Sequence, residues 1–435
     1  MVLSAFYLTI CFFPSLIAHG ITCFHNSFIV QKLLDLNFSQ RCPNLVQSAK
    51  LPTRNIKGCS KSSDHTMTVR TSQQQEMFDS LATPDACLKL EKHNQASRGQ
   101  ATTPRVDWSE IQSVSLLGKG ATSNVHLVST SLLENKLQSF ALKCLSPDFL
   151  TTPDEFVVAA GDLAMEAKIL SKLNHKNIVQ LRGVSSKNVS DAYSEGGKGY
   201  FILLDVLEGG TLKDRIKSWR RDNEERQRKN YLLRVLNARK IRRKRISEIQ
   251  ERLETVVVGI ADAMNYMHTQ DIVLRDLKPD NVGFDCKGDV QLFDFGLAQD
   301  VKNYSEGEMA GTMRYMAPEV MKGESKGDFA SDVYSFGVLL WEICTACTPF
   351  EELSKTSMET FADAIANKEV RPSLDKIPCD FTRNLIEECW DPASEKRPTF
   401  SRISKRIHRF LNMYCDCSEM TEKTIFDSFH SSDFQ

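Results

Sequence analysis

The most constraining feature of this 435-residue chain is an eight-residue run that is followed, at a short distance, by a second motif. The run reads Leu-Arg-Asp-Leu-Lys-Pro-Asp-Asn over residues 274–281, and Asp-Phe-Gly follows over residues 294–296. An amide and a carboxylate are oxygen ligands that Mg²⁺ accepts together with water, which fits Asn281 and Asp294. A further carboxylate, Asp276, would lie near an attacking hydroxyl. The two motifs therefore indicate phosphoryl transfer.

A glycine-containing turn lies between two predicted strands nearer the N-terminus. Residues 111–117 and 125–128 alternate as strands do, and the stretch between them contains Gly118 and Gly120. Glycines allow a tight turn and bring backbone N–H groups close to phosphate oxygens. Such a turn also fits an ordinary hairpin. It is not a dinucleotide-binding fingerprint, because a strand rather than a helix follows it.

A lysine on the third predicted strand favours a phosphate-binding role for the glycine turn. This strand covers residues 140–144 and carries Lys143, and a helix is predicted over residues 162–173. A lysine on a strand usually points to solvent, so a functional interpretation requires a carboxylate partner. Glu166 on the predicted helix is the candidate. Such an ion pair would hold the lysine against the α- and β-phosphates of a nucleotide.

In this order, the motifs resemble those of the eukaryotic protein kinase family over about residues 111–412. Ala-Pro-Glu over residues 317–319 and Arg397 complete the resemblance. It implies an α+β fold with two lobes. The N-lobe, about 111–205, would be built on a small antiparallel sheet, and the C-lobe, about 212–412, would be mainly helical. ATP would bind in the cleft between them.

The resemblance also implies a role for individual residues. The catalytic residues would be Asp276, Lys278, Lys143 and Glu166, with Lys278 at the γ-phosphate. The nucleotide-binding residues would be Leu117, Gly118, Lys119, Gly120, Ala121, Val125, Ala141, Lys143 and Leu204, with Leu204 as the gatekeeper of the adenine pocket. Asn281 and Asp294 would bind Mg²⁺, with Mn²⁺ as the alternative ion, and Glu319 and Arg397 would form a buried pair.

The loop at residues 276–281 also bears on the substrate. Its Asp-Leu-Lys-Pro-x-Asn pattern is typical of Ser/Thr members of the family, whereas tyrosine members carry Ala and Arg there. Residues 331–338 and the Cys389-Trp390 pair resemble the tyrosine-kinase-like branch of Ser/Thr kinases. We therefore expect an ATP-dependent protein Ser/Thr kinase that acts in signalling on protein substrates. The alternative is a pseudokinase scaffold that binds nucleotide and docks acidic partners.

Two positions depart from the family pattern. Ser123 replaces the third glycine of the loop, and Leu274 replaces the histidine of the His-Arg-Asp motif. Neither change removes a metal ligand or the carboxylate, so we expect an active enzyme. Arg275 is retained, and in the family this arginine pairs with a phosphate on the activation segment. Ser305 is the candidate phosphorylation site.

The overall charge conceals a local basic segment. The chain has 55 Lys and Arg against 56 Asp and Glu, a net charge of −1. Residues 213–252, an insertion in the predicted C-lobe, contain 16 Lys and Arg against 6 Asp and Glu, which is +10 and leaves −11 elsewhere. This insertion is either a solvated helical extension or a docking surface for an acidic protein or anionic lipid. Nucleic acid is not the expected partner.

The ends of the chain differ in composition from the region between them. Residues 1–20 form an apolar leader, which is a signal peptide, a membrane anchor or disordered. If residues 1–18 span a membrane, the cations that follow favour a cytoplasmic kinase domain. Residues 21–105 are a polar linker expected to be disordered, and residues 413–435 are a polar tail.

The cysteines fit a reducing compartment. There are 13 of them, an odd number in a long chain, which does not suggest a disulfide framework. Cys344 and Cys347 form a Cys-x-x-Cys pair, but no second pair follows at zinc-ligand spacing. Because they lie in or next to an apolar run, we expect both to be buried as small hydrophobic residues.

Overall fold

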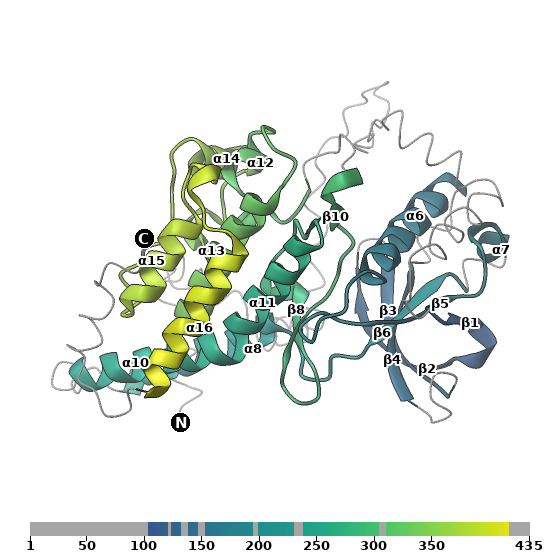
Figure 1. Cartoon of the computed structure of the whole chain (residues 1–435), viewed down its shortest axis with the longest axis horizontal. Coiled ribbons are helices and arrows are strands. Elements are labelled where there is room, and N and C mark those ends of the chain that lie inside the picture. The colour runs from purple at the N-terminus through teal and green to yellow at the C-terminus, as the bar shows by residue number, and fades with distance from the viewer. Residues whose placement is uncertain are drawn as a thin grey trace, which may run out of the picture. The chain divides into compact units, whose positions relative to one another are not determined.

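The computed structural model describes residues 103–120, 123–131, 138–146, 153–194, 199–229, 238–303 and 310–416 (Figure 1). All of them belong to one compact unit, Val69–Gln435. The predicted leader, nearly all of the linker and most of the tail lie outside these residues, as do Ala121 and Ser305. None of the described helices is both long and apolar enough to cross a membrane.

The N-terminal part of this unit is a six-stranded sheet in the order β1-β5-β6-β4-β3-β2. Its strands are β1 (Arg105–Val106), β2 (Gln112–Lys119), β3 (Ser123–Thr130), β4 (Gln138–Leu145), β5 (Leu181–Ser185) and β6 (Phe201–Asp205). Every neighbouring pair is antiparallel except β1 and β5. The predicted antiparallel sheet is therefore confirmed, and its strand β6 ends at Asp205. Beyond it, Leu207 packs against Gly283 of the helical part.

A short strand that the sequence pattern did not predict lies before the kinase-like motifs. β1 pairs in parallel with β5, and Val106 is only 1% exposed. Trp108, in the turn that follows, makes an edge-to-face contact with Phe201 at 5.7 Å between ring centroids. Together they cover an apolar cluster on one face of the sheet, which contains Val128, Phe140, Leu142, Phe201 and Leu203.

One long helix covers the opposite face of the sheet. α6 (Pro153–Leu170) starts nine residues before the predicted helix 162–173 and ends three residues before its end. The earlier start follows from Phe156 and Ala160, which are fully buried and continue the apolar stripe toward the N-terminus. A further short helix, α7 (Val189–Ser194), follows β5 and was not predicted.

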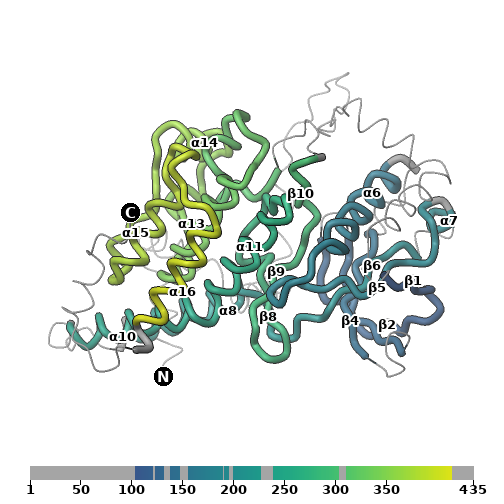
Figure 2. Tube along the Cα trace, viewed as in Figure 1, coloured from purple at the N-terminus to yellow at the C-terminus, as the bar shows by residue number. Residues whose placement is uncertain are grey.

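The C-terminal part is mainly helical, as predicted (Figure 2). Its helices are α8 (Leu212–Lys229), α10 (Ala238–Arg252), α11 (Val258–Thr269), α12 (Pro318–Met321), α13 (Phe329–Thr345), α14 (Met358–Ala366), α15 (Asp380–Cys389) and α16 (Phe400–Asp416). Two short two-stranded sheets pair β7 (Ile272–Val273) with β10 (Gln299–Asp300), and β8 (Val282–Phe284) with β9 (Val290–Leu292). The loop from β7 to β8 contains residues 274–281, and Asp294 follows β9, so the short strands position both motifs.

The basic insertion forms α8 and α10. A π-helical segment, Leu253–Val257, joins α10 directly to α11 without a loop. The last turns of α10 pack into the core through Ile249, whereas residues 239–245 are all exposed. The helical structure of the insertion agrees with the predicted helical extension. Docking of a partner to the insertion stays a prediction.

The two cysteines of the Cys-x-x-Cys pair differ in environment. Cys344 is buried in α13, as expected, and burial raises the pKa of its thiol. Cys347 lies beyond the helix and is only half-buried. Among the described residues, no group of three or more His, Cys, Asp and Glu side chains could hold a metal ion.

Candidate active site

The predicted lysine–glutamate pair is formed. Lys143 Nζ lies 2.7 Å from Glu166 Oε2 and 2.8 Å from Asp294 Oδ1. Burial alone would lower the pKa of Lys143, but the two carboxylates raise it above its ordinary value. Glu166 is 2% exposed, and its Oε1 also accepts a hydrogen bond from the Phe295 backbone N–H at 3.2 Å. The lysine is thus held as a cation between both parts of the fold.

Strand alternation explains why Lys143 faces inward. Leu142 is fully buried in the apolar cluster beneath Trp108, so its neighbours Ala141 and Lys143 face the other side of the sheet. Leu204 of β6 pairs with Ala141 in the register of the two strands. Ala141, Lys143 and Leu204 therefore share the face on which the resemblance places the nucleotide.

The glycine turn closes as a hairpin at the end of β2. The Gly120 N–H donates to the Ser123 carbonyl at 2.7 Å, and Val125 pairs with both Gly118 and Lys143 in the sheet. A Cβ atom added at Gly118 would meet open space, so no contact within the described residues requires glycine there. Leu117 is half exposed. The turn therefore presents the backbone at Gly118 toward space that the described residues do not fill.

The Asp276 carboxylate is held on both of its oxygens. Oδ2 accepts hydrogen bonds from Lys278 Nζ at 2.6 Å and Asn281 Nδ2 at 3.1 Å. Oδ1 accepts from the backbone N–H and the hydroxyl of Thr312, at 2.9 and 2.7 Å. Lys278 Nζ also donates to the Thr312 hydroxyl at 2.9 Å. Four donor groups therefore fix one carboxylate, and two of them come from Thr312, whose contact with Asp276 the sequence motifs did not predict.

A buried aspartate anchors the loop that carries Asp276. Asp332, which is fully buried, accepts hydrogen bonds from the backbone N–H groups of Leu274 at 2.9 Å and Arg275 at 2.8 Å. Its Oδ2 also lies 2.9 Å from His268 Nε2. Arg275 has a positive φ of 68°, which is unfavourable for a residue with a side chain. The Asp332 contacts offset this strain and fix the loop.

Gly311 brings Thr312 to Asp276. Gly311 has a φ of 120°, and a Cβ atom added there would lie 2.6 Å from the Arg275 carbonyl oxygen. Only glycine permits this approach between the segment before Thr312 and the loop at residues 274–281. A Gly-Thr pair before the Ala-Pro-Glu motif is the sequence signal that could have pointed to this contact.

The two candidate metal ligands fit a hard cation by their chemistry. The Asn281 amide nitrogen donates to the backbone carbonyl of Asp276 at 2.9 Å, which leaves its amide oxygen as a ligand atom. The Asp294 side chain is 46% exposed. Although burial of the carboxyl would raise its pKa, Lys143 lowers it overall, so Asp294 is ionised at neutral pH. An amide oxygen and a carboxylate are the donor set that Mg²⁺ and Mn²⁺ prefer.

The two departures from the family pattern are both accommodated. Leu274 is 1% exposed and belongs to the same apolar cluster as Phe295 and Leu170. Ser123 is 8% exposed, and its carbonyl accepts the hydrogen bond that closes the glycine turn. The hydrogen bonds of Asp276 with Lys278 and Asn281 are formed with both residues in place.

The predicted structural pair is also present. Arg397 donates to both carboxylate oxygens of Glu319, at 2.6 and 2.9 Å, and its side chain is fully buried. Two parallel hydrogen bonds of this kind fix orientation as well as distance. The pair ties the segment after Thr312 to the end of the helical part.

Comparison with known protein families matches residues 111–410 to the protein kinase domain. The chain belongs to the protein kinase family. This family uses ATP and a divalent metal ion, and its substrates are proteins. The kinase domain here is similar to the serine/threonine-protein kinase STY46 of Arabidopsis thaliana, with 29% identity over 66% of this chain and 43% of that protein.

Two further relatives belong to related groups of kinases. The mitogen-activated protein kinase kinase kinase 7-like protein of Drosophila melanogaster is 30% identical over 69% of this chain and 66% of its own length. The serine/threonine/tyrosine-protein kinase HT1 of Arabidopsis thaliana is 29% identical over 56% of this chain and 54% of its own. These relatives confirm the predicted resemblance to the tyrosine-kinase-like branch. The kinase chain spans only 16% of a longer Dictyostelium discoideum relative.

Proposed function

We propose that this chain is a protein serine/threonine kinase that transfers the γ-phosphate of ATP to hydroxyl groups of protein substrates in signalling. The observation that carries the proposal is the contact of the Asp276 carboxylate with both Lys278 and Thr312. It supplies a carboxylate for the substrate hydroxyl directly beside a cation for the transferred phosphate. The similarity to STY46, a serine/threonine-protein kinase, supports serine and threonine as acceptors.

In the proposed reaction, Asp276 orients the substrate hydroxyl and accepts its proton. The hydroxyl oxygen forms a bond to the γ-phosphorus, the bond from that phosphorus to the bridging oxygen breaks, and ADP leaves. Lys278, whose Nζ is 2.6 Å from Asp276, offsets the charge of the transferred group. The chemistry needs positioning and charge balance rather than a covalent intermediate.

Lys143 would bind the α- and β-phosphates, with Glu166 as its positioning residue. Leu117, Val125, Ala141 and Leu204 would contact the adenine and ribose, and the backbone of Gly118, Lys119, Gly120 and Ala121 would face the phosphates. Asn281 and Asp294 would hold Mg²⁺, with Mn²⁺ as an alternative, and the ion would supply positive charge at the phosphate oxygens.

The test compares the wild-type protein with Asp276→Asn, which keeps the size of the side chain and removes its negative charge. We expect phosphate transfer from ATP to a generic protein substrate to be lost in the variant, while nucleotide binding persists. Analysis of the labelled amino acids should show phosphoserine and phosphothreonine. Equal labelling by both proteins contradicts the role of Asp276, and phosphotyrosine as the main product contradicts the acceptor class.

No observation favours the pseudokinase alternative. The contacts of Lys143, Asp276 and Asn281 form among the described residues despite Leu274 and Ser123. A pseudokinase would bind nucleotide and show no transfer in the same assay. Docking of an acidic partner to residues 213–252 and membrane attachment through residues 1–18 stay predictions.

A further inference from the structure

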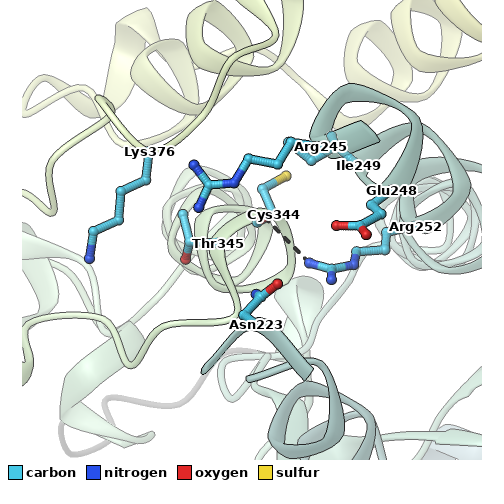
Figure 3. A pocket seen from close by; sticks show the side chains of 8 residues that line it. All are labelled: Asn223, Arg245, Glu248, Ile249, Arg252, Cys344, Thr345 and Lys376. Carbon is cyan, nitrogen blue, oxygen red and sulfur yellow. Dashed lines mark hydrogen bonds between the residues drawn. The ribbon is translucent and has the colours of Figure 1, made fainter. Parts of the chain in front are cut away.

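A cavity lies between the basic insertion and α13, and it shares no residue with the candidate active site (Figure 3). It is open to solvent on one side, and about 330 Å³ of unfilled space lies within and in front of it. The residues that line it are Asn223, Arg245, Glu248, Ile249, Arg252, Cys344, Thr345 and Lys376. Nothing in the proposed kinase reaction uses this cavity.

Arg252 is a nearly buried cation whose donors are only partly used. It is 7% exposed, its Nη1 donates to the Ile343 carbonyl at 2.7 Å, and its guanidinium stacks over Trp219. Within the described part of the chain, its Nε and Nη2 donate no hydrogen bond. Figure 3 shows the guanidinium directed into the cavity. Because a guanidinium has five N–H donors and stays charged, the cavity contains donors that suit an anion.

The cavity also carries an excess of positive charge. Its one carboxylate, Glu248, is paired with Arg226 of α8. Arg245 forms no hydrogen bond or ion pair with any described residue. Among the same residues, the only hydrogen bond of Lys376 Nζ is a weak one to Cys347 Sγ, at 3.6 Å. With Arg252, three cations therefore line the cavity, and its one carboxylate is already paired with a fourth cation outside it. Burial lowers the pKa of the Arg252 guanidinium, which expresses the cost of holding this cation away from water.

The exposed half of α10 extends this positive surface. Its cations Arg239, Lys240, Arg242, Arg243 and Lys244 are all exposed. No carboxylate of the described residues lies within 4.0 Å of any of them. At 3.6 residues per turn, these five cations together with Arg245 are spread around the helix rather than confined to one stripe. A flat membrane surface reaches only one side of such a helix, whereas an acidic polypeptide can follow it.

We propose that the cavity binds the phosphoryl group of a phosphorylated serine or threonine in an acidic protein segment. The cations of α10 bind the carboxylates that flank this residue. A phosphoryl group carries nearly two negative charges and three acceptor oxygens, which match the unused donors of Arg252 and the side chains of Arg245 and Lys376. Arg252 is recessed between helices, where a group on a protruding chain reaches it more readily than a lipid headgroup in a bilayer.

The inference rests on the proposed function, because a serine/threonine kinase works among proteins that carry this modification. The site would recruit a substrate or partner that is already phosphorylated. It would hold that protein on the helical part of the kinase, through contacts separate from those at Asp276.

The test measures binding of a fluorescent acidic peptide that contains one phosphoserine, and of its unphosphorylated twin, to the full-length protein without ATP. We expect the phosphopeptide to bind at least about tenfold more tightly. The double variant Arg245→Gln/Lys376→Gln should abolish this difference, because it removes two of the cations that would bind the phosphoryl group. Both side chains lie on the exposed rim of the cavity, so their loss should not disturb folding. Arg402→Gln, an exposed arginine of α16, is the matched control and should keep the difference.

Equal binding of the two peptides, or an unchanged difference in the double variant, overturns the proposal. If inorganic phosphate displaces the fluorescent phosphopeptide as well as unlabelled phosphopeptide does, the cavity is a site for small anions, and the proposed role of α10 is wrong. Vesicles of phosphatidylserine, or duplex DNA, that displace the phosphopeptide at lower concentration overturn the choice of partner. The peptide-binding test contains no ATP and does not depend on phosphate transfer. A negative result in it therefore leaves the proposed kinase activity standing, and refutation of the proposed kinase activity in the Asp276→Asn test would leave the peptide-binding result standing.

Discussion

The hydroxyl of Tyr315 donates a 2.6 Å hydrogen bond to Glu342 Oε2 in the buried interior of the helical lobe. Tyr315 lies three residues after Thr312, and Glu342 belongs to α13. The contact therefore connects the segment at the active site with the central helix of the lobe. Burial raises the pKa of Glu342 to about 7, against the opposing influence of Tyr315, Arg220 and Arg314.

This raised pKa predicts a pH dependence of stability. The folded pKa of Glu342, about 7, lies above its ordinary value of 4.5, so between these pH values the folded state binds more protons than the unfolded state. The contribution of Glu342 to the free energy of unfolding should fall by about 3 kcal/mol as pH rises through this window. Thermal melting of wild type and Glu342→Gln between pH 5 and about pH 8 measures it. Parallel curves for the two proteins would contradict the assignment.

The side chain of Thr312 should affect turnover more than nucleotide binding. Thr312→Ala removes a hydrogen bond to Asp276 and one from Lys278, each worth about 1.5–3 kcal/mol where a charged group takes part. We expect kcat to fall by about tenfold or more, with little change in KM for ATP. Thr312→Ser keeps the hydroxyl and should restore most of the activity. If Ser and Ala behave alike, the hydroxyl contacts do not support catalysis.

Removal of Lys143 should cost both activity and stability. Lys143→Met leaves the carboxylate of Glu166, which is 2% exposed, without its cation. Breaking a buried pair in this way costs about 3–5 kcal/mol, so we expect a lower Tm and a loss of phosphate transfer. Lys172→Met is the matched control, because the Lys172 side chain is 41% exposed in its ion pair with Asp300. An exposed pair of this kind should contribute less than about 1 kcal/mol to stability. An equal drop in Tm for both variants would argue against the buried pair.

Leu274 should contribute mainly to packing. Because its side chain is 1% exposed in the main apolar cluster, Leu274→Ala should lower the free energy of unfolding by about 2–5 kcal/mol. Leu274→Met nearly conserves the volume and should cost less than about 1.5 kcal/mol. Denaturant unfolding measures both. A small effect of the alanine variant would show that this position is not a core position.

The motifs predicted the two lobes and the residues that meet at the site, because each motif specifies a local shape and a chemical group. They did not predict contacts made to backbone groups. Asp332 accepts from the N–H groups of Leu274 and Arg275, and no side-chain pattern records such a contact. Thr312 reaches Asp276 across 36 residues, through the backbone conformation of Gly311.

Element boundaries were predicted less well, for two physical reasons. α6 begins before the predicted helix because Phe156, Ala159 and Ala160 continue its apolar stripe at helical spacing toward the N-terminus, and small alanines give a weak apolar signal in the sequence. α10 continues into α11 because a π-helical segment allows an apolar helix to follow a basic one without a loop. The cavity beside Arg252 depends on the packing of α8, α10 and α13, which a one-dimensional pattern does not contain.

The parallel pairing of β1 with β5 determines how far the protein can be shortened. A protein that starts at residue 111 would lack Val106 and Trp108 and would turn β5 into an open edge strand. The apolar cluster around Phe140 and Phe201 would then face water beside unpaired backbone groups, a combination that promotes aggregation. The smallest soluble form of this kinase should therefore begin before Arg105, upstream of its family boundary.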